Sequence, residues 1–524
     1  MTFLQFFLAL LPSAMLHPPT PRISDNMQLV LSAAACLGII AVIARGFLPQ
    51  SNSGLPLPPS PPTRRLRGHF LPPHSPYLTV ARWIDEYGPL ITIRSGLENI
   101  VIIGRYKAVV DIMENQGKSL ADRPRMIAAG EMFNGGISIA FAPFGERFRR
   151  MRRALHTHLQ PKAAEAYQPL QMSHAKNTVL DILDDPYNFQ DHVTTYAATT
   201  IMKVAYGTTA PTSATDPEVV EITQLFRMTN TILRPGAYLV DTIPWLRYLP
   251  WYGRELKLGF ERSMKLYMSH LNRVKEQMQS NVDIGPSFAK HMLEGSDLFG
   301  LTEAETASLA GTFFGAGSST TVVAICTVFM AAACFPEEQA TVQAELDAVI
   351  GRQRAPTFAD QDFLPRLHAF ISEAVRWRPV GPNGLAHRTT NDVIWENYCI
   401  PAGTTVLGNQ WAISRDPEVY PEPDAFKPQR WIDDQGRLRD DLQNFIYGFG
   451  RRVCPGQHVA NRSVFINSLL ILWAFRLALD PTKPVDDMGY MNRELSKRPC
   501  PIEFETRIPG TELRRMMQNY PEVA

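Results

Sequence analysis

The sequence predicts a mainly α-helical protein with minor β structure, in which a single large domain follows an N-terminal membrane anchor. Long amphipathic segments alternate with polar loops over most of the chain, and apolar residues at helical spacing predict helices. Residues 88–104 (GPLITIRSGLENIVIIG) predict a β-hairpin, because two β-branched runs flank a short turn. Near the N-terminus, one apolar run is long enough to cross a bilayer.

The composition is that of a globular protein. Of the 524 residues, 45% are hydrophobic and 20% are charged, which indicates a sizeable core. The net charge of +1 predicts no nucleic acid as a partner. The sequence contains neither a Gly-rich dinucleotide fingerprint nor a P-loop.

The anchor region, residues 1–48, contains the apolar run Leu29–Ala44. We predict one transmembrane helix over about 29–47, just long enough to span a bilayer. Basic residues are denser after this run than before it, which places the rest of the chain in the cytoplasm. They are Arg45, Arg64, Arg65 and Arg67 after the run and Arg22 before it. An earlier apolar run, Phe3–Leu16, is either a second membrane segment or precedes a working start at Met27.

Three further boundaries follow from composition. Prolines are dense over residues 49–76, which favours a semi-rigid, extended hinge over a flexible linker. The main globular domain is predicted to occupy residues 77–515. Residues 516–524 are predicted to form a C-terminal tail.

The stretch YGFGRRVCPGQHVA, residues 447–460, places one cysteine among arginines and glycines. Gly450 and Gly456 permit backbone conformations and close approaches that other residues forbid. Pro455 suits the first turn of a helix, and apolar residues then recur at helical spacing. Cys454 is therefore predicted at a helix N-terminus beside two arginines, where positive charge lowers the pKa of a thiol. These surroundings favour a thiolate.

A cysteine can also form a disulfide, bind zinc or act as a nucleophile. The six cysteines are scattered without the dense spacing of a disulfide-stapled fold. Zinc requires a closer cluster of cysteine and histidine, and only His458 lies nearby. A nucleophilic cysteine remains an alternative. A thiolate can also be the protein ligand of a haem iron, and the remaining motifs favour that role.

A long buried helix is predicted between Thr302 and Pro336. Thr302 and Glu305 form a capping box, and apolar residues occur on all faces of the segment. Its middle contains the polar cluster Gly315–Thr321, which includes Ser319 and Thr320. Hydroxyl groups in an apolar helix can bond to carbonyls of the preceding turn and loosen the helix. Close helix packing is the alternative reason for these small residues.

A buried ion cluster is predicted around FISEAVRWRPV. Glu373 and Arg376 face the same side of a helix at i, i+3. The spacing alone is weak, because most such pairs are solvated surface bridges. Arg430 in the non-helical stretch PEPDAFKPQRW would complete a Glu–Arg–Arg set, which is stable when buried only if all partners are present.

The segment FGERFRRMRRALH, residues 144–156, is predicted to form a strongly basic helix. Arginine suits planar carboxylates such as haem propionates. We predict that Arg152 points inward for this purpose and that the other arginines form a solvated, cationic face. That face is either a docking surface for an electron donor or an ordinary solubilising surface.

Along the chain, the basic helix comes first, followed by the polar cluster of the long helix, the Glu373–Arg376 helix, the Arg430 loop and the cysteine loop. These five motifs in this order resemble the cytochrome P-450 superfamily of haem-thiolate monooxygenases, from about Leu55 onward. The resemblance implies the cytochrome P-450 fold, with haem between the long central helix and the cysteine loop. It implies roles for the following residues: Cys454 as the axial ligand of the haem iron, Arg152, Arg452 and His387 as propionate partners, Thr320 and Ser319 as catalytic residues beside the oxygen-binding face, and Glu373, Arg376 and Arg430 as a structural triad.

The resemblance also implies an activity. The expected cofactor is haem b, and the expected reaction is hydroxylation or a related oxidation of a bulky, apolar small molecule, terpenoid- or polyketide-like, with O2. Electrons would come from a separate NADPH–cytochrome P-450 reductase. The anchor and hinge resemble the microsomal branch, which implies a single-pass protein of the endoplasmic reticulum membrane with a cytoplasmic catalytic domain. Fungal secondary-metabolism members are the most similar in general character.

Two other functions remain open at this point. One is a haem-thiolate isomerase or dehydratase, which works without O2 or a reductase; Thr320 argues against it. The other is a membrane-bound haem protein without turnover. The sequence also departs from the family pattern at Tyr447, where phenylalanine is usual, at Phe148, where tryptophan is usual, and at Ser319, where an acid is usual.

Two further expectations concern the substrate and the membrane. Candidate pocket residues are Phe313, Phe314 and Ala316 on the central helix, Val380 and Leu385 after the Glu373 helix, and residues 126–133. Phe313 and Phe314 are equally consistent with core packing. The aromatic loop Pro244–Gly253 is predicted to contact the bilayer interface, with a packed loop as the alternative.

Overall fold

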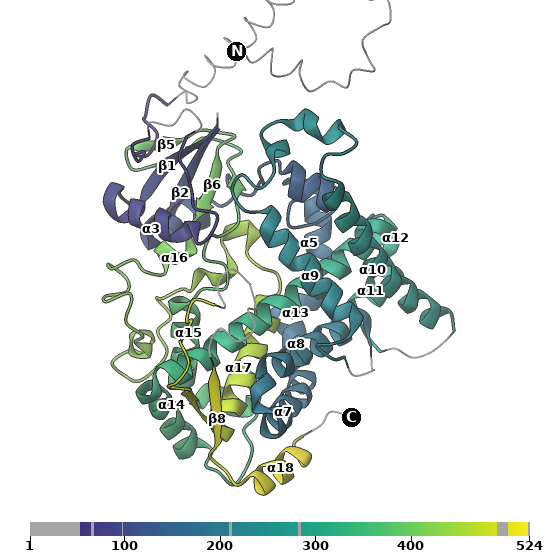
Figure 1. Ribbon diagram of the computed structural model, residues 1–524, viewed down its shortest axis with the longest axis vertical. Coiled ribbons are helices and arrows are strands. Elements are labelled where there is room, and N and C mark those ends of the chain that lie inside the picture. The colour runs from purple at the N-terminus through teal and green to yellow at the C-terminus, as the bar shows by residue number, and fades with distance from the viewer. Residues whose placement is uncertain are drawn as a thin grey trace, which may run out of the picture. The chain divides into compact units, whose positions relative to one another are not determined.

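The structure is a computed structural model, shown in Figure 1, and it describes residues 53–63, 68–96, 98–208, 212–280, 285–489 and 501–521. The chain divides into two units, Met1–Asn52 and Ser53–Ala524. The predicted transmembrane helix over about 29–47 and the first apolar run lie outside the described residues. Everything below concerns the second unit.

This unit is predominantly helical. Its α-helices are α3 (Pro76–Tyr87), α4 (Tyr106–Val109), α5 (Glu146–Leu159), α6 (Pro161–Ala166), α7 (Gln168–Asp184), α8 (Phe189–Tyr206), α9 (Pro217–Ile232), α10 (Arg254–Gln279), α11 (Phe288–Glu294), α12 (Ser296–Phe299), α13 (Glu303–Cys334), α14 (Pro336–Val349), α15 (Pro365–Trp377), α16 (Gln410–Ile413), α17 (Gln457–Ala474) and α18 (Gly510–Gln518). Two π-helical segments, η2 (Val110–Glu114) and η3 (Ile127–Phe133), precede α5.

Short 3-10 turns and strands complete the unit. The 3-10 turns are η4 (Pro186–Asn188), η5 (Leu239–Asp241), η6 (Pro244–Tyr248), η7 (Phe358–Phe363), η8 (Pro428–Trp431), η9 (Phe445–Tyr447) and η10 (Gly450–Arg452). The strands are β1 (Leu90–Ser95), β2 (Glu98–Ile103), β3 (His387–Arg388), β4 (Val393–Trp395), β5 (Tyr398–Ile400), β6 (Thr405–Gly408), β7 (Phe475–Leu479) and β8 (Ile502–Thr506).

The predicted hairpin is confirmed as β1 and β2, which pair antiparallel from Leu90↔Ile103 to Ser95↔Glu98. Strand β6, from much later in the chain, adds in parallel to β2, and β3 closes a sheet of order β1-β2-β6-β3. In Figure 1 the purple strands β1 and β2 lie beside the green β6. Since β3 carries His387, the sheet also positions one predicted site residue.

Part of the predicted hinge is bonded to two sheets, to β1 of this sheet and to β5 of the separate sheet β4-β5. The backbone carbonyls of Pro56 and Pro59 accept hydrogen bonds from Cys399 N at 2.9 Å and Thr92 N at 2.7 Å. Proline has no amide hydrogen, so it can serve an edge strand only as an acceptor. These prolines therefore belong to the second unit, whose boundary falls at residue 52/53.

The predicted central helix is confirmed as α13, 32 residues long with a capping box of Thr302 and Glu305. It crosses the middle of the unit between α8 and α17 (Figure 1) and packs against both. Among the described residues, α13 is the one helix long and apolar enough to cross a membrane, yet 83% of its apolar window is buried within the protein. It is therefore a core helix.

Packed structure continues past the predicted domain boundary at residue 515. Helix α18 runs from Gly510 to Gln518, and Met516 and Met517 are buried in the main hydrophobic core. Tyr520 is 3% exposed, and its hydroxyl donates to Pro356 O at 2.6 Å. Apolar residues at helical spacing continue the packed domain to at least Tyr520, so the tail is shorter than predicted.

Candidate active site around Cys454

The cysteine stands in a tight loop in front of α17. Its backbone N–H donates to Tyr447 O at 2.9 Å, which closes the loop. Gly448 and Gly450 adopt left-handed φ angles of 84° and 51°, and a Cβ on Gly450 would lie 2.4 Å from Met113 O. Only glycine fits such a close backbone approach. The two glycines therefore fix the course of the chain that leads to Cys454.

The helix begins later than predicted. Gly456 is the N-cap of α17, which starts at Gln457, so Pro455 lies before the helix instead of in its first turn. Cys454 precedes the N-cap by two residues and remains next to the N-terminal end of α17. The side chain of Cys454 is half-buried.

Arg152 and Arg452 converge near this loop. Arg152 Nη1 donates to Val453 O at 2.9 Å. Burial lowers the pKa of Arg152, and the nearby Cys454 opposes that shift. Arg452 donates to Ala121 O at 2.6 Å and to Ala142 O at 2.7 Å. Its guanidinium carbon lies 3.6 Å above the Phe148 ring, so the ring present here holds the cation by stacking.

His387 and Arg123 complete this group. The His387 Nδ1 lies 2.8 Å from Leu120 O, and burial together with the charges of Arg123 and Arg452 lowers its pKa to about 3. His387 is therefore neutral at physiological pH while no anion faces it. Arg123 is itself buried, and burial lowers its pKa to about 9.

Arg123 was not anticipated from the sequence. It donates to Ala140 O at 3.1 Å, to Leu385 O at 3.2 Å and to Ala386 O. Arg125, two residues on, is instead exposed and pairs with Glu131 at 2.5 Å. The local sequence gives no reason to expect that one of these two arginines is buried and the other exposed, because only the tertiary fold decides it. No sequence feature could have found Arg123.

Helix α13 contributes an uncovered patch. Most of the helix is buried, but Ala316 is exposed and Thr320, one turn later, is half-buried. The hydroxyls of Thr320 and Ser318 donate back to Ala316 O and Phe314 O, each at 2.8 Å. The polar cluster thus places a small residue and a threonine hydroxyl on one open face of a core helix.

Ser319 differs from its neighbours. Its side chain is 9% exposed, and its Oγ is buried without a hydrogen-bond partner among the described residues. Phe314 is fully buried, with its ring 6.4 Å from that of Tyr206 and 5.8 Å from that of His270. Phe314 is therefore a core residue. Three residues of α13 were candidates for the pocket, and among them Ala316 is exposed, whereas Phe313 and Phe314 are buried.

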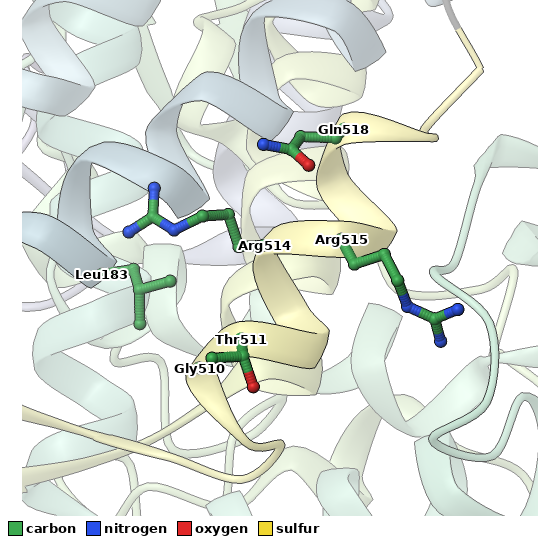
Figure 2. A pocket seen from close by; sticks show the side chains of 6 residues that line it. All are labelled: Leu183, Gly510, Thr511, Arg514, Arg515 and Gln518. Atoms are coloured by element: carbon green, nitrogen blue, oxygen red, sulfur yellow. The ribbon is translucent and has the colours of Figure 1, made fainter.

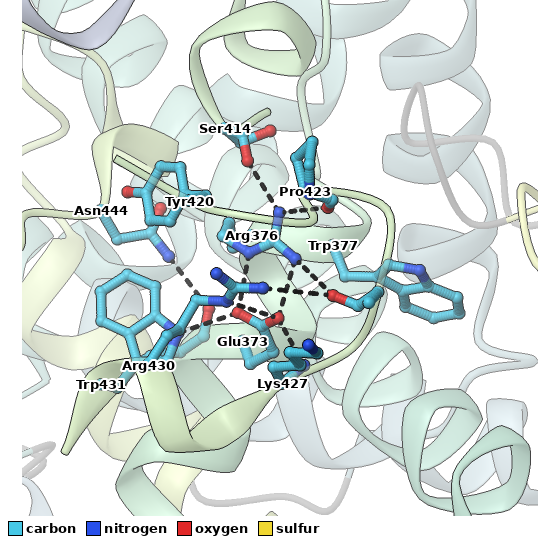
Figure 3. A network of polar contacts seen from close by, with 12 residues as sticks. Glu373, Arg376, Trp377, Ser414, Tyr420, Pro423, Lys427, Arg430, Trp431 and Asn444 are labelled. Carbon is cyan, nitrogen blue, oxygen red and sulfur yellow. Dashed lines mark hydrogen bonds and ion pairs between the residues drawn. The ribbon is translucent and has the colours of Figure 1, made fainter. Parts of the chain in front are cut away.

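The predicted Glu–Arg–Arg cluster is brought together (Figure 3). Arg376 Nε and Nη2 bond the two carboxylate oxygens of Glu373 at 2.7 and 2.8 Å, and Arg430 Nε reaches Oε1 at 3.1 Å. Glu373 and Arg376 are both 0% exposed. Two further donors reach the carboxylate, Lys427 N at 2.8 Å and Trp431 Nε1 at 2.9 Å.

Arg376 also ties down residues 414–425, the first part of the long loop that runs from α16 to Cys454. Its Nη1 donates to Ser414 O and Pro423 O, both at 2.8 Å, and its Nη2 donates to Ala425 O at 3.2 Å. Figure 3 shows the carbonyls of Ser414 and Pro423 bonded to one guanidinium. A buried ion cluster that also satisfies backbone carbonyls fixes the path of a loop that has little regular structure.

Comparison with known proteins decides the family. The family model for cytochrome P450 matches residues 58–505 of this chain. The chain belongs to the cytochrome P450 family. The P450 match includes every site residue discussed above, from Arg123 to Cys454.

Curated P450 relatives are similar over nearly the whole chain. Cytochrome P450 monooxygenase 64 from Postia placenta is 45% identical over 93% of this chain and 98% of its own length. Cytochrome P450 monooxygenase 113 from the same fungus is 44% identical over 92% and 98% of the two chains. The monooxygenase claR from Ampulloclitocybe clavipes is 32% identical over 89% and 88%. This P450 is therefore a monooxygenase by family, and the family implies a haem iron with a cysteine thiolate ligand, O2, a redox partner and a small-molecule substrate.

The residues present in this P450 fit a haem group. The buried guanidinium groups of Arg123, Arg152 and Arg452 interact with the charges of Asp122 and Cys454, so cations outnumber anions in this region. Buried cations require anionic partners, and the two haem propionates are such anions. The half-buried thiol of Cys454 would supply the thiolate ligand that the family implies.

A surface hollow elsewhere on this P450 is unrelated to that site. Figure 2 shows it beside α18 and the end of α7, lined by Leu183, Gly510, Thr511, Arg514, Arg515 and Gln518. The cationic side chain of Arg514 already pairs with Asp184. None of the site residues lines this hollow, and we assign it no role.

Proposed function

We propose that this P450 uses haem b, bound through Cys454, to hydroxylate or otherwise oxidise a bulky, apolar small molecule of fungal secondary metabolism, terpenoid- or polyketide-like. The observation that carries the proposal is the cysteine loop, in which two glycines, Arg152 and the N-terminal end of α17 surround one half-buried thiol. When bound, the haem supplies the activation of O2.

The protein residues divide the remaining work. Cys454 holds the iron as a thiolate, and Arg152, Arg452 and Arg123 hold the propionates, with neutral His387 as a hydrogen-bond partner. Glu373, Arg376 and Arg430 act as a structural triad that keeps the loop before Cys454 in place. The ion pairs of Glu373 with Arg376 and Arg430 support the role of the triad, and the hydrogen bond from Arg152 to Val453 O supports a position of Arg152 next to the cysteine loop.

Thr320 and Ser319 are proposed to move protons. Proton transfer requires hydrogen bonds of about 2.6–3.2 Å or one bridging water. The Thr320 hydroxyl donates its hydrogen bond to Ala316 O at 2.8 Å, so it must rotate before it can donate to another acceptor. Ser319 Oγ, which no described residue engages, is available to pass a proton on through water.

The substrate class is proposed from the character of the candidate pocket residues. Ala316, Leu385 and the segment Ile127–Phe133 are almost entirely apolar, and apolar walls favour apolar ligands. Segment η3 packs with Leu225, Ile232, Val240 and Leu256 into one hydrophobic cluster. Addition of apolar polycyclic compounds should shift the haem absorption spectrum, and small polar compounds should not; the reverse result would contradict the substrate class.

Electron supply and location follow the same proposal. A separate NADPH–cytochrome P450 reductase is proposed to dock on exposed arginines of α5, including Arg149 and Arg153. The chain is proposed to be a single-pass protein of the endoplasmic reticulum membrane, with its catalytic domain in the cytoplasm. O2 uptake that depends on both reductase and substrate is expected; turnover without either would favour an isomerase, and no turnover would favour a non-catalytic haem protein.

The central test is Cys454→Ser. The variant should lose the reduced carbon-monoxide spectrum of thiolate-bound haem, while Cys326→Ser, which changes a fully buried cysteine of α13, should keep it. If Cys454→Ser retains that spectrum, Cys454 is not the ligand.

A further inference from the structure

Three polar side chains meet inside the helical core where α7, α8 and α17 pack together. They are Gln171, Tyr196 and Asn467, with exposures of 0%, 2% and 1%. Each has one buried atom that no described residue satisfies, namely Gln171 Oε1, Tyr196 Oη and Asn467 Oδ1. A buried polar atom without a partner costs about 1–3 kcal/mol, so three in one place require an explanation.

The orientation of both amides is fixed by their other atoms. Gln171 Nε2 donates to Val459 O at 2.9 Å and to Ser463 Oγ at 2.8 Å. Asn467 Nδ2 donates to Ser463 O at 2.8 Å. A backbone carbonyl can only accept, so turning either amide over would set oxygen against oxygen. The two unsatisfied atoms are therefore genuine acceptors.

The three groups share one neighbourhood, because Ser463 contacts two of them directly. Gln171 bonds the hydroxyl of Ser463 and Asn467 bonds its carbonyl. Burial raises the pKa of Tyr196, and weak hydrogen bonding toward Ser463, Asn467 and Thr200 opposes that shift. The Tyr196 hydroxyl thus lies close to these residues, yet it reaches none of them with the distance and angle of a full hydrogen bond.

We propose that one buried water molecule binds here, between α7, α8 and α17. It donates to Gln171 Oε1 and Asn467 Oδ1 and accepts from the Tyr196 hydroxyl. Two acceptors and one donor match the capacity of a single water, and three hydrogen bonds are typical of a buried one. The water satisfies all three groups at once.

A metal cation is a poorer occupant. The three ligands are neutral. Burial, and then the positive charge of the nearby Lys203, lower the pKa of His174. His174 Nδ1 is already 2.9 Å from Thr200 Oγ1. An uncompensated buried charge is costly, whereas a water requires no counter-charge.

The water has a consequence for the cysteine loop. Gln171 is bonded to Val459, in the first turn of α17, and Asn467 lies two turns further along the same helix. The water therefore connects α7 and α8 to the helix that follows Cys454. This consequence rests on the proposed role of Cys454, but the water site itself does not.

The direct test is a crystal structure of the haem-loaded protein at a resolution that shows ordered waters. We expect one density peak about 2.7–3.2 Å from Gln171 Oε1, Asn467 Oδ1 and Tyr196 Oη. An empty position, with Tyr196 Oη bonded directly to a protein atom, would overturn the proposal. A metal at shorter distances would overturn it as well.

Matched tyrosine variants supply the second test. Tyr196→Phe keeps the ring and removes the hydroxyl, and it should abolish the peak and speed loss of the thiolate-haem carbon-monoxide spectrum by about fivefold, as expected for one lost hydrogen bond. Tyr520→Phe removes an equally buried hydroxyl, one that bonds Pro356 O directly at 2.6 Å, and it should leave the peak in place.

A double-mutant cycle separates a shared water from three independent defects. Tyr196→Phe and Asn467→Leu should be non-additive in the midpoint of urea unfolding, because both act on the same water. Tyr520→Phe and Asn467→Leu should be additive. Additivity in the first pair would overturn the proposal, whatever becomes of Cys454.

Discussion

Neutralising Glu373 is the sharpest test of how the buried ion cluster holds the loop before Cys454. In Glu373→Gln the side chain keeps its shape but loses its charge and one acceptor oxygen. Five donors now reach the carboxylate: Arg376 Nε and Nη2, Arg430 Nε, Lys427 N and Trp431 Nε1. All five distances lie between 2.7 and 3.1 Å.

The amide cannot satisfy these donors in either orientation. Oε2 accepts from Arg376 Nε and Trp431 Nε1, and Oε1 accepts from Arg376 Nη2, Arg430 Nε and Lys427 N. An amide nitrogen at either position leaves at least two donors facing another donor. Arg376 would also be fully buried without its anion. Breaking a buried ion pair costs about 3–5 kcal/mol, a large part of the ~5–15 kcal/mol that stabilises a typical domain.

Two measurements check this estimate. Haem bound per polypeptide should fall sharply in Glu373→Gln, and the midpoint of urea unfolding should fall by an amount equivalent to about 3–5 kcal/mol. The matched control is Glu512→Gln, which breaks a pair of the same i, i+3 spacing on the surface, where Arg515 lies 3.8 Å away. Exposed pairs contribute about 0–1 kcal/mol. Equal losses in the two variants would refute the assigned role of the cluster.

Three other outcomes are expected. Thr320→Ala should lower product formation about tenfold or more and raise hydrogen peroxide released per NADPH, because positioned proton transfer contributes roughly 10²–10⁴-fold; Ser319→Ala should act more mildly, and unchanged coupling in both would favour the isomerase. Burial lowers the pKa of His174 to about 4, so acid stabilises the unfolded chain from pH ~6.5 downward. Between pH 7 and 5, the free energy of unfolding of His174→Gln should therefore fall by about 1–2 kcal/mol less than that of the wild type. In the matched variant His156→Gln, which changes an exposed histidine, the free energy of unfolding should fall as much as in the wild type. Finally, Trp245, Tyr248 and Trp251 are 56%, 79% and 66% exposed, so quencher-bearing lipids should quench the tryptophan fluorescence of the full chain in vesicles. The double variant Trp245→Phe, Trp251→Phe should lose that quenching. Undiminished quenching in the double variant would show that other tryptophans contact the lipid and would contradict the predicted membrane contact of this loop.

The elements that sequence predicted well are those determined by local physics. The capping box of Thr302 and Glu305 fixed the start of α13, because its hydrogen bonds span only three residues. The hairpin of β1 and β2 was equally local. The end of the domain was missed because Met516, Met517 and Tyr520 belong to the domain only through contacts with a distant part of the core.

The site was predictable where a motif carried it and unpredictable where burial decided it. Cys454 and the Glu373 cluster stand in short, distinctive patterns. By contrast, His387 is neutral because Arg123 and Arg452, from distant segments, face it in a buried position. Its charge state depends on burial and on neighbours that no local pattern brings together.

The cation group also explains how this P450 accommodates Phe148. A phenylalanine ring has no N–H to offer an anion, so it cannot replace the hydrogen bond of the tryptophan usual in the family. The ring instead lies 3.6 Å beneath the Arg452 guanidinium and orients it, while Arg452 spends two of its donors on Ala121 O and Ala142 O. Arg123, held by three backbone carbonyls, adds a further buried cation to the same group. Under the proposed function, anion binding here would depend on several guanidinium groups fixed by the backbone. Arg123→Leu should then lower the haem bound per polypeptide, and an unchanged haem content would contradict a role for Arg123.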